Sequence, residues 1–370
     1  MDKNLIQQKA FESINFKSRN GIIMSMGTGK TRLGLNCCTH FLEANKTSKI
    51  LIVYPKLAIK EAWLNEMKLI DFKYEKRLTF STIISVCNKN DVSNYDLIIV
   101  DECHSITERS YECLKKAKSI IGLTGTPIKN EKSDKYFIYN KLFPTVFSYA
   151  VKDAIKDSLL NNFKLIVHRI PLSSEKNIKV NWNGKSFYVS ERSQYDSISR
   201  KIQQAYSFQD KKKYGLIRLK NIKEFNSKVF FLQQKILPYV VNKTLLFTST
   251  IDQSDLLAIN SYNSKNLDSK DNLTKFCNGE INLLSCVEQL SEGVNIPDLK
   301  EGIIMHSYGS EVKLSQKIGR ILRLNPKDLA VLHIIVYRDT VDWEWVMKAL
   351  QGKFDNTMNL IDYDSNFDKL

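Results

Sequence analysis

A short loop near the amino terminus has the residue types and spacing of a phosphate site. Residues 24–31 read Met-Ser-Met-Gly-Thr-Gly-Lys-Thr, after an apolar run and before an amphipathic segment, so the sequence predicts strand, tight loop and helix. Glycines let backbone N–H groups converge on phosphate oxygens, and the helix N-terminus adds the positive end of its dipole. Lys30 would reach the β- and γ-phosphates, and the Thr31 hydroxyl would hold Mg²⁺. The segment predicts a nucleotide site, although Met24 stands where the usual pattern has glycine.

A pair of carboxylates follows the apolar run at residues 97–100. Asp101 and Glu102 lie about seventy residues after the loop, a distance that suits two strands and two helices between them. Asp101 would hold Mg²⁺, usually through water, and Glu102 would orient and deprotonate the attacking water. The alternative is an acidic loop at a strand end with no part in catalysis.

Two arginines in the second half could contact a triphosphate. Arg320 and Arg323 lie on a predicted helix, and their spacing of three places both on one face. A guanidinium pair suits the γ-phosphate, and an arginine of this kind contributes ~10³–10⁵ in rate in other NTPases. Taken alone, the pair is better explained as two surface arginines on an amphipathic helix.

The elements that must position these residues follow an alternating pattern. Between residues 21 and 127, continuous apolar runs typical of parallel strands alternate with helical patterns, at 50–54, 97–100 and 120–123. This pattern predicts a doubly wound parallel sheet. It returns after residue 243, with strand candidates at 244–247, 281–284, 302–305 and 330–336. We therefore expect an α/β protein with two tandem parallel-sheet domains.

The segment between the two domains differs from both. It carries a strand candidate at 163–169, a hairpin signal at Asn183-Gly184 and two helical patterns at 191–206 and 216–234. We divide the chain into a first domain, a basic α/β inter-domain segment with the hairpin and helices, a second domain and a C-terminal tail, at residues 1–135, 136–240, 241–352 and 353–370.

Charge is concentrated in the same region. The chain has 55 Lys and Arg against 40 Asp and Glu, a net charge of +15. Residues 151–243 hold 19 basic against 7 acidic residues, with the densest cluster at Lys211-Lys212-Lys213. Either this is a surface for a polyanion or it is a solvated surface in a lysine-rich chain.

Cysteine usage and hydropathy restrict the class of protein. The seven cysteines form no C-x-x-C pair, which argues against zinc and against a disulfide framework and suits a reducing compartment. No apolar run approaches the ~20 residues of a membrane span, and the amino terminus lacks the layout of a signal peptide. We expect a cytoplasmic protein without membrane or zinc partners, or one in the host cytoplasm if its source is a virus or phage.

In this order the segments resemble the motifs of the superfamily 2 helicases and translocases, whose core is two RecA-like domains with ATP between them. Gln7 with Ala10 is similar to the adenine element, and Asp101–His104 matches motif II in its DExH form. Motifs I, Ia, III, IV, V and VI are matched at Met26–Thr31, Tyr54–Lys56, Leu123–Pro127, Leu246–Ser249, Glu292–Pro297 and Gln316–Arg323. The resemblance covers nearly the whole chain.

The resemblance implies an ATPase that uses ATP and Mg²⁺ and is stimulated by nucleic acid. It implies catalytic roles for Lys30, Glu102, Gln316, Arg320 and Arg323. Nucleotide contacts are implied at Gln7, Met26, Gly27, Thr28, Gly29, Lys30, Thr31 and Asp101, with Thr31 and Asp101 toward the metal. It implies coupling roles for Thr124, Thr126 and Gly293. Nucleic-acid contacts are expected at Pro55, Lys56, Lys60, Thr82, Thr248, Ser249, Ser285, Lys211, Lys212 and Lys213.

Finer features are similar to the Swi/Snf-type and phage-type DNA translocases. These are Thr124–Pro127 with the following Ile128-Lys129-Asn130, Glu191-Arg192 with Tyr195-Asp196, and Thr340-Val341 after Tyr337. We therefore expect a DNA helicase or translocase, a monomer or one recruited by a protein partner. An RNA helicase or RNA-stimulated ATPase is the alternative, and a nucleic-acid-binding regulatory module with a decayed ATPase is a third reading.

Overall fold

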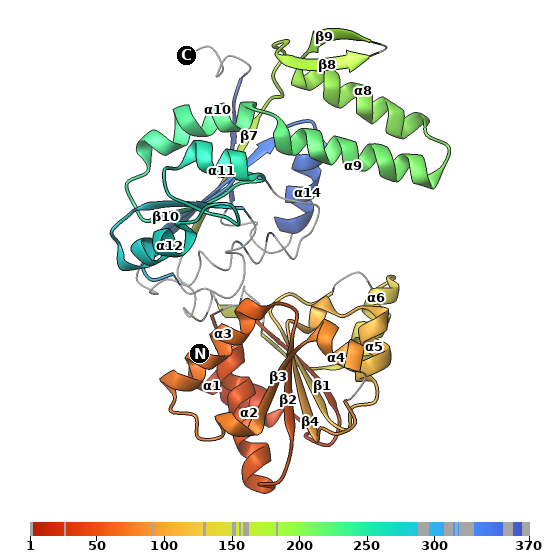
Figure 1. Cartoon of the computed structure of the whole chain (residues 1–370), viewed down its shortest axis with the longest axis vertical. Helices are drawn as coiled ribbons and strands as arrows, with labels where there is room; N and C mark the ends of the chain where they lie inside the picture. Colours follow the sequence, from red (N-terminus) through yellow and green to blue (C-terminus); the bar gives the residue numbers. More distant parts are fainter. Residues whose placement is uncertain are drawn as a thin grey trace. The chain divides into compact units, whose positions relative to one another are not determined.

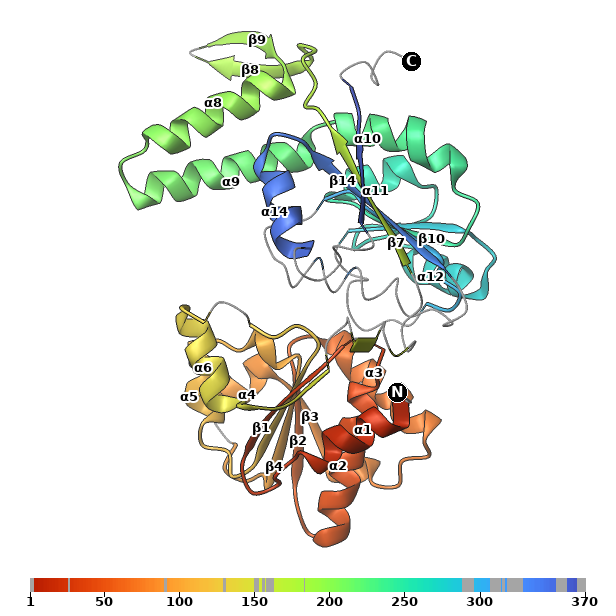
Figure 2. The same cartoon turned by 180° about the vertical axis from the view of Figure 1, so that it is seen from behind.

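Two parallel β-sheets form the framework of the protein. The computed structural model describes residues 3–25, 27–89, 92–128, 131–149, 153–154, 157, 163–182, 184–287, 296–306, 314, 317, 329–350 and 358–364. The described residues up to 157 form one unit, and those from Phe163 onward form a second (Figures 1 and 2). The expected α/β architecture with tandem parallel sheets is confirmed.

Unit 1 holds a six-stranded sheet in the order β3-β2-β4-β5-β1-β6, with every pairing parallel. Its strands are β1 (Arg19–Met24), β2 (Ile50–Tyr54), β3 (Leu78–Thr82), β4 (Leu97–Asp101), β5 (Ile120–Thr124) and β6 (Thr145–Tyr149). Strands β2, β4 and β5 are buried along their whole length, because alternate side chains enter opposite cores. These are the strands that the apolar runs predicted.

Helices cover both faces of this sheet. They are α1 (Lys3–Glu12), α2 (Lys30–Ala44), α3 (Leu57–Leu69), α4 (Ile83–Lys89), α5 (Glu108–Leu114) and α6 (Asp134–Leu142). One core joins α1, α2 and α3 to side chains such as Ile52 and Ile99, and the other joins α4, α5 and α6 to Val53 and Val100 (Figure 1). Parallel strands bring all their carboxyl ends to one edge, where a doubly wound sheet binds its ligands.

Unit 2 holds a seven-stranded parallel sheet in the order β11-β12-β10-β13-β14-β7-β15. Its strands are β7 (Phe163–Ile170), β10 (Thr244–Phe247), β11 (Ser261–Tyr262), β12 (Leu283–Cys286), β13 (Glu301–Ile304), β14 (Ala330–Tyr337) and β15 (Met358–Asp362). Its helices are α8 (Glu191–Gln204), α9 (Phe208–Glu224), α10 (Ser227–Phe231), α11 (Ile251–Leu257), α12 (Ser269–Asn278) and α14 (Val341–Leu350).

Two boundaries differ from the expected domain division. Strand β7 pairs with β14 along its whole length, so the chain from Phe163 belongs to the sheet of unit 2 and not to a separate inter-domain segment. Strand β15 pairs with the other side of β7, so the tail supplies an edge strand of the same sheet. Pairing between distant segments sets both boundaries.

The expected hairpin is present at β8 (Ile178–Trp182) and β9 (Lys185–Val189), which pair antiparallel. Helices α8 and α9 follow it, lie side by side and extend away from the sheet of unit 2 (Figures 1 and 2). None of the described helices is long and apolar enough to cross a membrane.

Candidate nucleotide site

The phosphate loop lies between β1 and α2 at the carboxyl edge of the unit 1 sheet. Gly27 and Gly29 have φ values of 79° and 91°, a region that L side chains avoid. A Cβ on Gly29 would also collide with the side-chain amide of Gln7. Both glycines are therefore needed for a loop that ends at the first turn of α2, where backbone N–H groups are available to an anion.

Buried polar side chains hold this loop in shape. Gln7 Nε2 donates to the carbonyl of Thr28 (3.1 Å), and Thr28 Oγ1 donates to the carbonyl of Ser25 (2.6 Å). The Ser25 hydroxyl is buried and finds no hydrogen-bond partner among the described residues. A buried hydroxyl of this kind beside glycine-rich backbone fits a phosphate oxygen as its partner.

Met24 does not interrupt the cradle, although it stands where the pattern has glycine. Its side chain is fully buried in the core beneath α1 and α2, so only its backbone faces the loop. That backbone is used, because Lys30 Nζ donates to the Met24 carbonyl (3.2 Å). Met26 lies outside the described residues.

Asp101 ends β4 in a buried position, with 6% of its surface exposed. Its Oδ2 accepts a hydrogen bond from the indole Nε1 of Trp63 (2.8 Å), and its Oδ1 accepts one from the backbone of Glu102 (2.9 Å). Burial, together with the neighbouring charge of Glu102, raises the pKa of Asp101 to about 6, although the Trp63 hydrogen bond and the Lys30 ammonium act in the lowering direction. The Lys30 charge thus acts on Asp101, and a divalent cation would satisfy the buried carboxylate.

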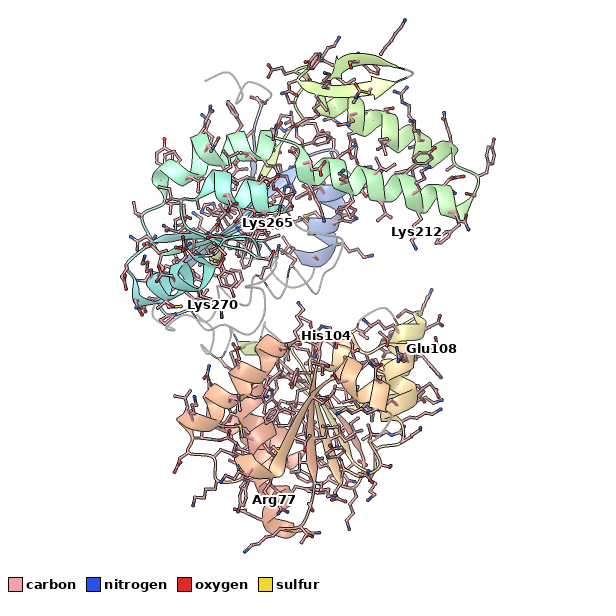
Figure 3. All side chains as sticks on the ribbon, in the orientation of Figure 1. Arg77, His104, Glu108, Lys212, Lys265 and Lys270 are labelled. Atoms are coloured by element: carbon pink, nitrogen blue, oxygen red, sulfur yellow. The ribbon has the colours of Figure 1, made fainter. Side chains whose placement is uncertain are left out.

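Glu102 belongs to a polar cluster with His104 and two threonines. Its backbone is left-handed, with a φ of 49°, and the ring Nδ1 of His104 lies 3.2 Å from Glu102 Oε2. The same Nδ1 lies 2.8 Å from the Thr124 hydroxyl and 3.3 Å from that of Thr126. Non-glycine residues in this backbone region cluster at functional sites. Figure 3 shows His104 at this edge of unit 1.

Four expected nucleic-acid contacts of unit 1 lie near the same edge. Pro55 and Lys56 directly follow β2, and Thr82 ends β3, where its hydroxyl donates to Ser85 Oγ (2.9 Å). Lys60 lies one turn into α3 with its ammonium over the ring of Phe80 (5.9 Å). Lys56 is exposed and the other three are half-buried. The structure therefore gathers these four on the edge that also carries the loop.

Two of the nucleic-acid contacts expected in unit 2 have internal hydroxyls, and their role in binding stays a prediction. Thr248 and Ser285 are fully buried. The Thr248 hydroxyl donates to the carbonyl of Thr250 (3.1 Å), and the Ser285 hydroxyl donates to that of Ser254 (2.8 Å). Their hydroxyls stabilise the junction of β10, β12 and α11. Ser249 is half-buried.

The remaining predicted residues divide into two groups. Lys211, Lys212 and Lys213 are exposed on α9. The others, Gly293, Gln316, Arg320 and Arg323, lie outside the described residues, so their place in the site stays a prediction. Sequence reasoning missed the role of Trp63 and His104 at the carboxylates. His104 had a local signal, since it follows Glu102 by two positions, whereas the contact of Trp63 with Asp101 spans two elements.

Comparison with known proteins gives the class. Residues 1–129 match the family model for the res subunit of type III restriction enzymes, and residues 227–325 match the helicase conserved C-terminal domain. The DNA 3'-5' translocase XPB2 of Sulfurisphaera tokodaii is 24% identical over 389 residues, which cover 91% of this chain and 82% of that protein.

Solved structures share the fold. A fragment of a putative HsdR subunit of a type I restriction enzyme from Vibrio vulnificus matches 98% of this chain and 69% of its own, with a TM-score of 0.63 and 18% identity. The type ISP restriction-modification enzyme LlaBIII bound to DNA matches 97% of this chain and 31% of its own, with a TM-score of 0.62 and 15% identity. With both helicase domains in order on tandem parallel sheets, the chain belongs to the superfamily 2 helicases and translocases. The likeness to its Swi/Snf-type and phage-type members stays a prediction.

Proposed function

We propose that this protein is a DNA translocase or helicase that couples ATP hydrolysis to movement on DNA or to its remodelling. The observation that carries the proposal is that the Lys30 ammonium acts on the buried carboxylate of Asp101, which Glu102 follows, at one edge of the unit 1 sheet. A phosphate loop with its lysine beside a buried carboxylate is the equipment of a nucleoside triphosphatase.

The residues of unit 1 take distinct roles in this reaction. The loop backbone, the Ser25 hydroxyl and Lys30 would bind the phosphates, and Gln7 would approach the adenine. Thr31 and Asp101 would hold Mg²⁺, which offsets the charge of the phosphate oxygens. Glu102 would accept the proton of the attacking water while His104 orients its carboxylate.

Unit 2 would complete the site through its arginines. We propose that Arg320 and Arg323 contact the γ-phosphate with Gln316, and that Gly293 responds to the nucleotide state. Loss of the γ-phosphate on hydrolysis would then release unit 2, which is the differential contact that a motor needs. Thr124 and Thr126 would report the state of Glu102, because both approach the His104 ring that contacts it.

DNA is favoured over RNA as the track. One relative is named a DNA translocase, and one structural neighbour is a restriction enzyme solved with DNA. Pro55, Lys56, Lys60 and Thr82 would hold the strand through its phosphates, a form of contact that carries little sequence information. We expect a monomer, or a protein recruited by a partner, that acts in the cytoplasm.

The test is ATP hydrolysis measured with single-stranded, duplex and branched DNA and with RNA of matched length. The proposal predicts stimulation by DNA well above stimulation by RNA. Stimulation by RNA alone would assign the protein to the RNA helicases. Turnover near zero with every polynucleotide would overturn the proposal in favour of a binding module.

A further inference from the structure

The distal part of the α8–α9 pair adds no buried side chain to unit 2. All residues from Asp196 to Asn221 are described, and none of them is buried. The two helices contact each other instead, as where Arg218 donates to Ser199 Oγ (3.3 Å). In Figures 1 and 2 the pair extends away from the sheet. The core of unit 2 does not explain why the chain builds these helices.

The base of the pair is held firmly. Glu191, with 2% of its surface exposed, accepts hydrogen bonds from the backbone of Ser173 (3.1 Å) and of Ser227 (3.0 Å). The Tyr195 hydroxyl accepts one from the backbone of Val341 (2.9 Å). Ile222 is buried where α9 returns to unit 2. The distal turn is therefore presented from a fixed support.

Two aromatic rings flank that turn in full solvent. Ser207 caps α9, because the backbone N–H of Asp210 donates to its hydroxyl (2.9 Å) and the hydroxyl donates to the Asp210 carboxylate (2.7 Å). Tyr206 and Phe208, on either side of this cap, are 103% and 81% exposed. Burial of such rings would stabilise a fold, so two of them standing on an ordered turn suit a ligand.

The charge around the turn indicates which ligand. Residues 196–221 hold seven Lys and Arg against two Asp and Glu. Lys211, Lys212 and Lys213 in the first turns of α9 are exposed and have no ion-pair partner among the described residues. Figure 3 labels Lys212 on α9. Flat rings beside such lysines match a nucleic acid with unpaired bases, whose faces stack and whose phosphates are anionic.

We propose that the α8–α9 turn binds unpaired nucleotides, with bases on Tyr206 and Phe208 and phosphates on the three lysines. The inference rests on the proposed function in taking nucleic acid as the ligand. Base faces inside a duplex are covered by their neighbours. The turn therefore selects DNA with a single-stranded arm over a blunt duplex.

The first experiment measures binding without ATP, by fluorescence anisotropy, to a duplex with a single-stranded arm and to the blunt duplex of the same sequence. Tyr206→Ala/Phe208→Ala should weaken binding to the armed DNA by about 5- to 150-fold for each ring that stacks a base. Binding to the blunt duplex should change far less. Unchanged binding to the armed DNA overturns the inference, and so does an equal loss on both DNAs.

Two control variants accompany it. Tyr206→Phe/Phe208→Tyr keeps both rings and should bind as the unmodified protein does. Tyr239→Ala removes an aromatic side chain that is 75% exposed elsewhere in unit 2 and should leave binding unchanged. No residue between Asp196 and Asn221 is buried. The Tyr206→Ala/Phe208→Ala variant should therefore have the same melting temperature as the unmodified protein.

The second experiment isolates the lysines. Lys211→Ala/Lys212→Ala/Lys213→Ala should reduce the slope of log K against log salt for single-stranded DNA by about 2, as expected for three lost phosphate contacts. An unchanged slope overturns the lysine assignment. Neither measurement uses ATP, so failure of ATP hydrolysis would count against the proposed function alone, and failure of stacking against this inference alone.

Discussion

Trp63 Nε1 donates a 2.8 Å hydrogen bond to Asp101 Oδ2, across 38 positions of the chain. The Trp63 side chain is fully buried on α3, and its ring also lies against Gly34 of α2, where a Cβ would collide with it. The Trp63 side chain on α3 thus contacts both α2, which follows the phosphate loop, and the carboxylate of Asp101. A shift of α3 would therefore act directly on Asp101.

Replacement of Trp63 by phenylalanine keeps most of the packing and removes the N–H donor. A hydrogen bond to a charged group contributes about 1.5–3 kcal/mol, so Trp63→Phe should destabilise unit 1 by an amount of this order. It should also raise the Mg²⁺ concentration that half-saturates ATP hydrolysis, because Asp101 loses its orienting partner. A Mg²⁺ titration of turnover checks this, with Trp343→Phe in unit 2 as the control. Identical titrations for Trp63→Phe and the unmodified protein would contradict the role.

Separate roles for Lys30 and Glu102 predict two different defects. Lys30→Ala removes a phosphate ligand and should weaken ATP binding as well as hydrolysis. Glu102→Gln removes the base but keeps the side-chain shape, so ATP should bind nearly as before while turnover falls by a general-base contribution of roughly 10²–10⁴. Binding of a fluorescent ATP analogue and steady-state turnover separate the two. If Glu102→Gln turned over normally, the base assignment would be wrong.

The sheet of unit 1 was predictable where its strands are buried on both faces. β2, β4 and β5 are continuous apolar runs, and each was expected within a residue or so of its observed bounds. The edge strands β3 and β6 were not expected, because one side of an edge strand is solvated and most of their residues are half-exposed or exposed. β15 was missed as well: it is a short edge strand whose residues, Leu360 and Ile361 included, are mostly exposed, so no buried run marks it.

Some residues of the candidate site could be predicted from the sequence and others could not. Lys30 and the carboxylates were predictable because each lies in a short segment whose residue types and spacing carry the chemistry. The contact of Trp63 with Asp101 was not, because it depends on how α3 packs against β4. Thr248 and Ser285 were assigned by motif position alone, which does not reveal the direction of a side chain, and both hydroxyls turned out to be internal.

A buried polar chain across four strands of unit 2 predicts a dependence of stability on pH. His168 lies between the Tyr363 hydroxyl (2.9 Å) and Nδ1 of His333 (2.9 Å), and His333 Nε2 lies 3.3 Å from Glu301 Oε1. Burial, with a smaller contribution from the charge of His333, lowers the pKa of His168 from 6.5 to about 3. The unfolded chain therefore binds more protons than the native one between these values, and stability falls as the pH drops below 6.5.

Between pH 6.5 and pH 5, protonation of His168 in the unfolded chain should lower the free energy of unfolding by about 2 kcal/mol. Urea unfolding at a series of pH values measures it. His168→Gln keeps a polar side chain that cannot titrate, so its stability should depend less steeply on pH over the same interval, whatever its absolute stability. Parallel pH profiles for the variant and the unmodified protein would exclude His168 as the source.

An ion pair in the core of unit 2 gives the last prediction. Lys228 Nζ on α10 donates to Asp342 Oδ2 on α14 (2.6 Å), and the two side chains are 0% and 1% exposed. The ammonium also donates to the carbonyl of Met305 (2.8 Å), and the same carboxylate oxygen accepts from the backbone of Tyr337 (3.0 Å). The pair therefore ties two helices to the ends of β13 and β14, although burial itself lowers the pKa of Lys228.

Removal of the Lys228 charge alone should lower the free energy of unfolding far more than removal of the Lys228 and Asp342 charges together. Lys228→Met leaves the Asp342 carboxylate buried without its cation, a change that typically costs 3–5 kcal/mol. Lys228→Met/Asp342→Asn leaves no buried charge and keeps an acceptor for the Tyr337 backbone, so it should be more stable than Lys228→Met alone. Urea unfolding of Lys228→Met, Asp342→Asn and the double variant measures the coupling. The control is Lys275→Met, which breaks a solvent-exposed ion pair with Asp271 on α12 and should leave the urea midpoint unchanged. If the two single substitutions lowered the free energy of unfolding by amounts that add up in the double variant, the two charges would not act as a pair. A double variant more stable than Lys228→Met is expected only if Asp342 is destabilising when it is left without its cation.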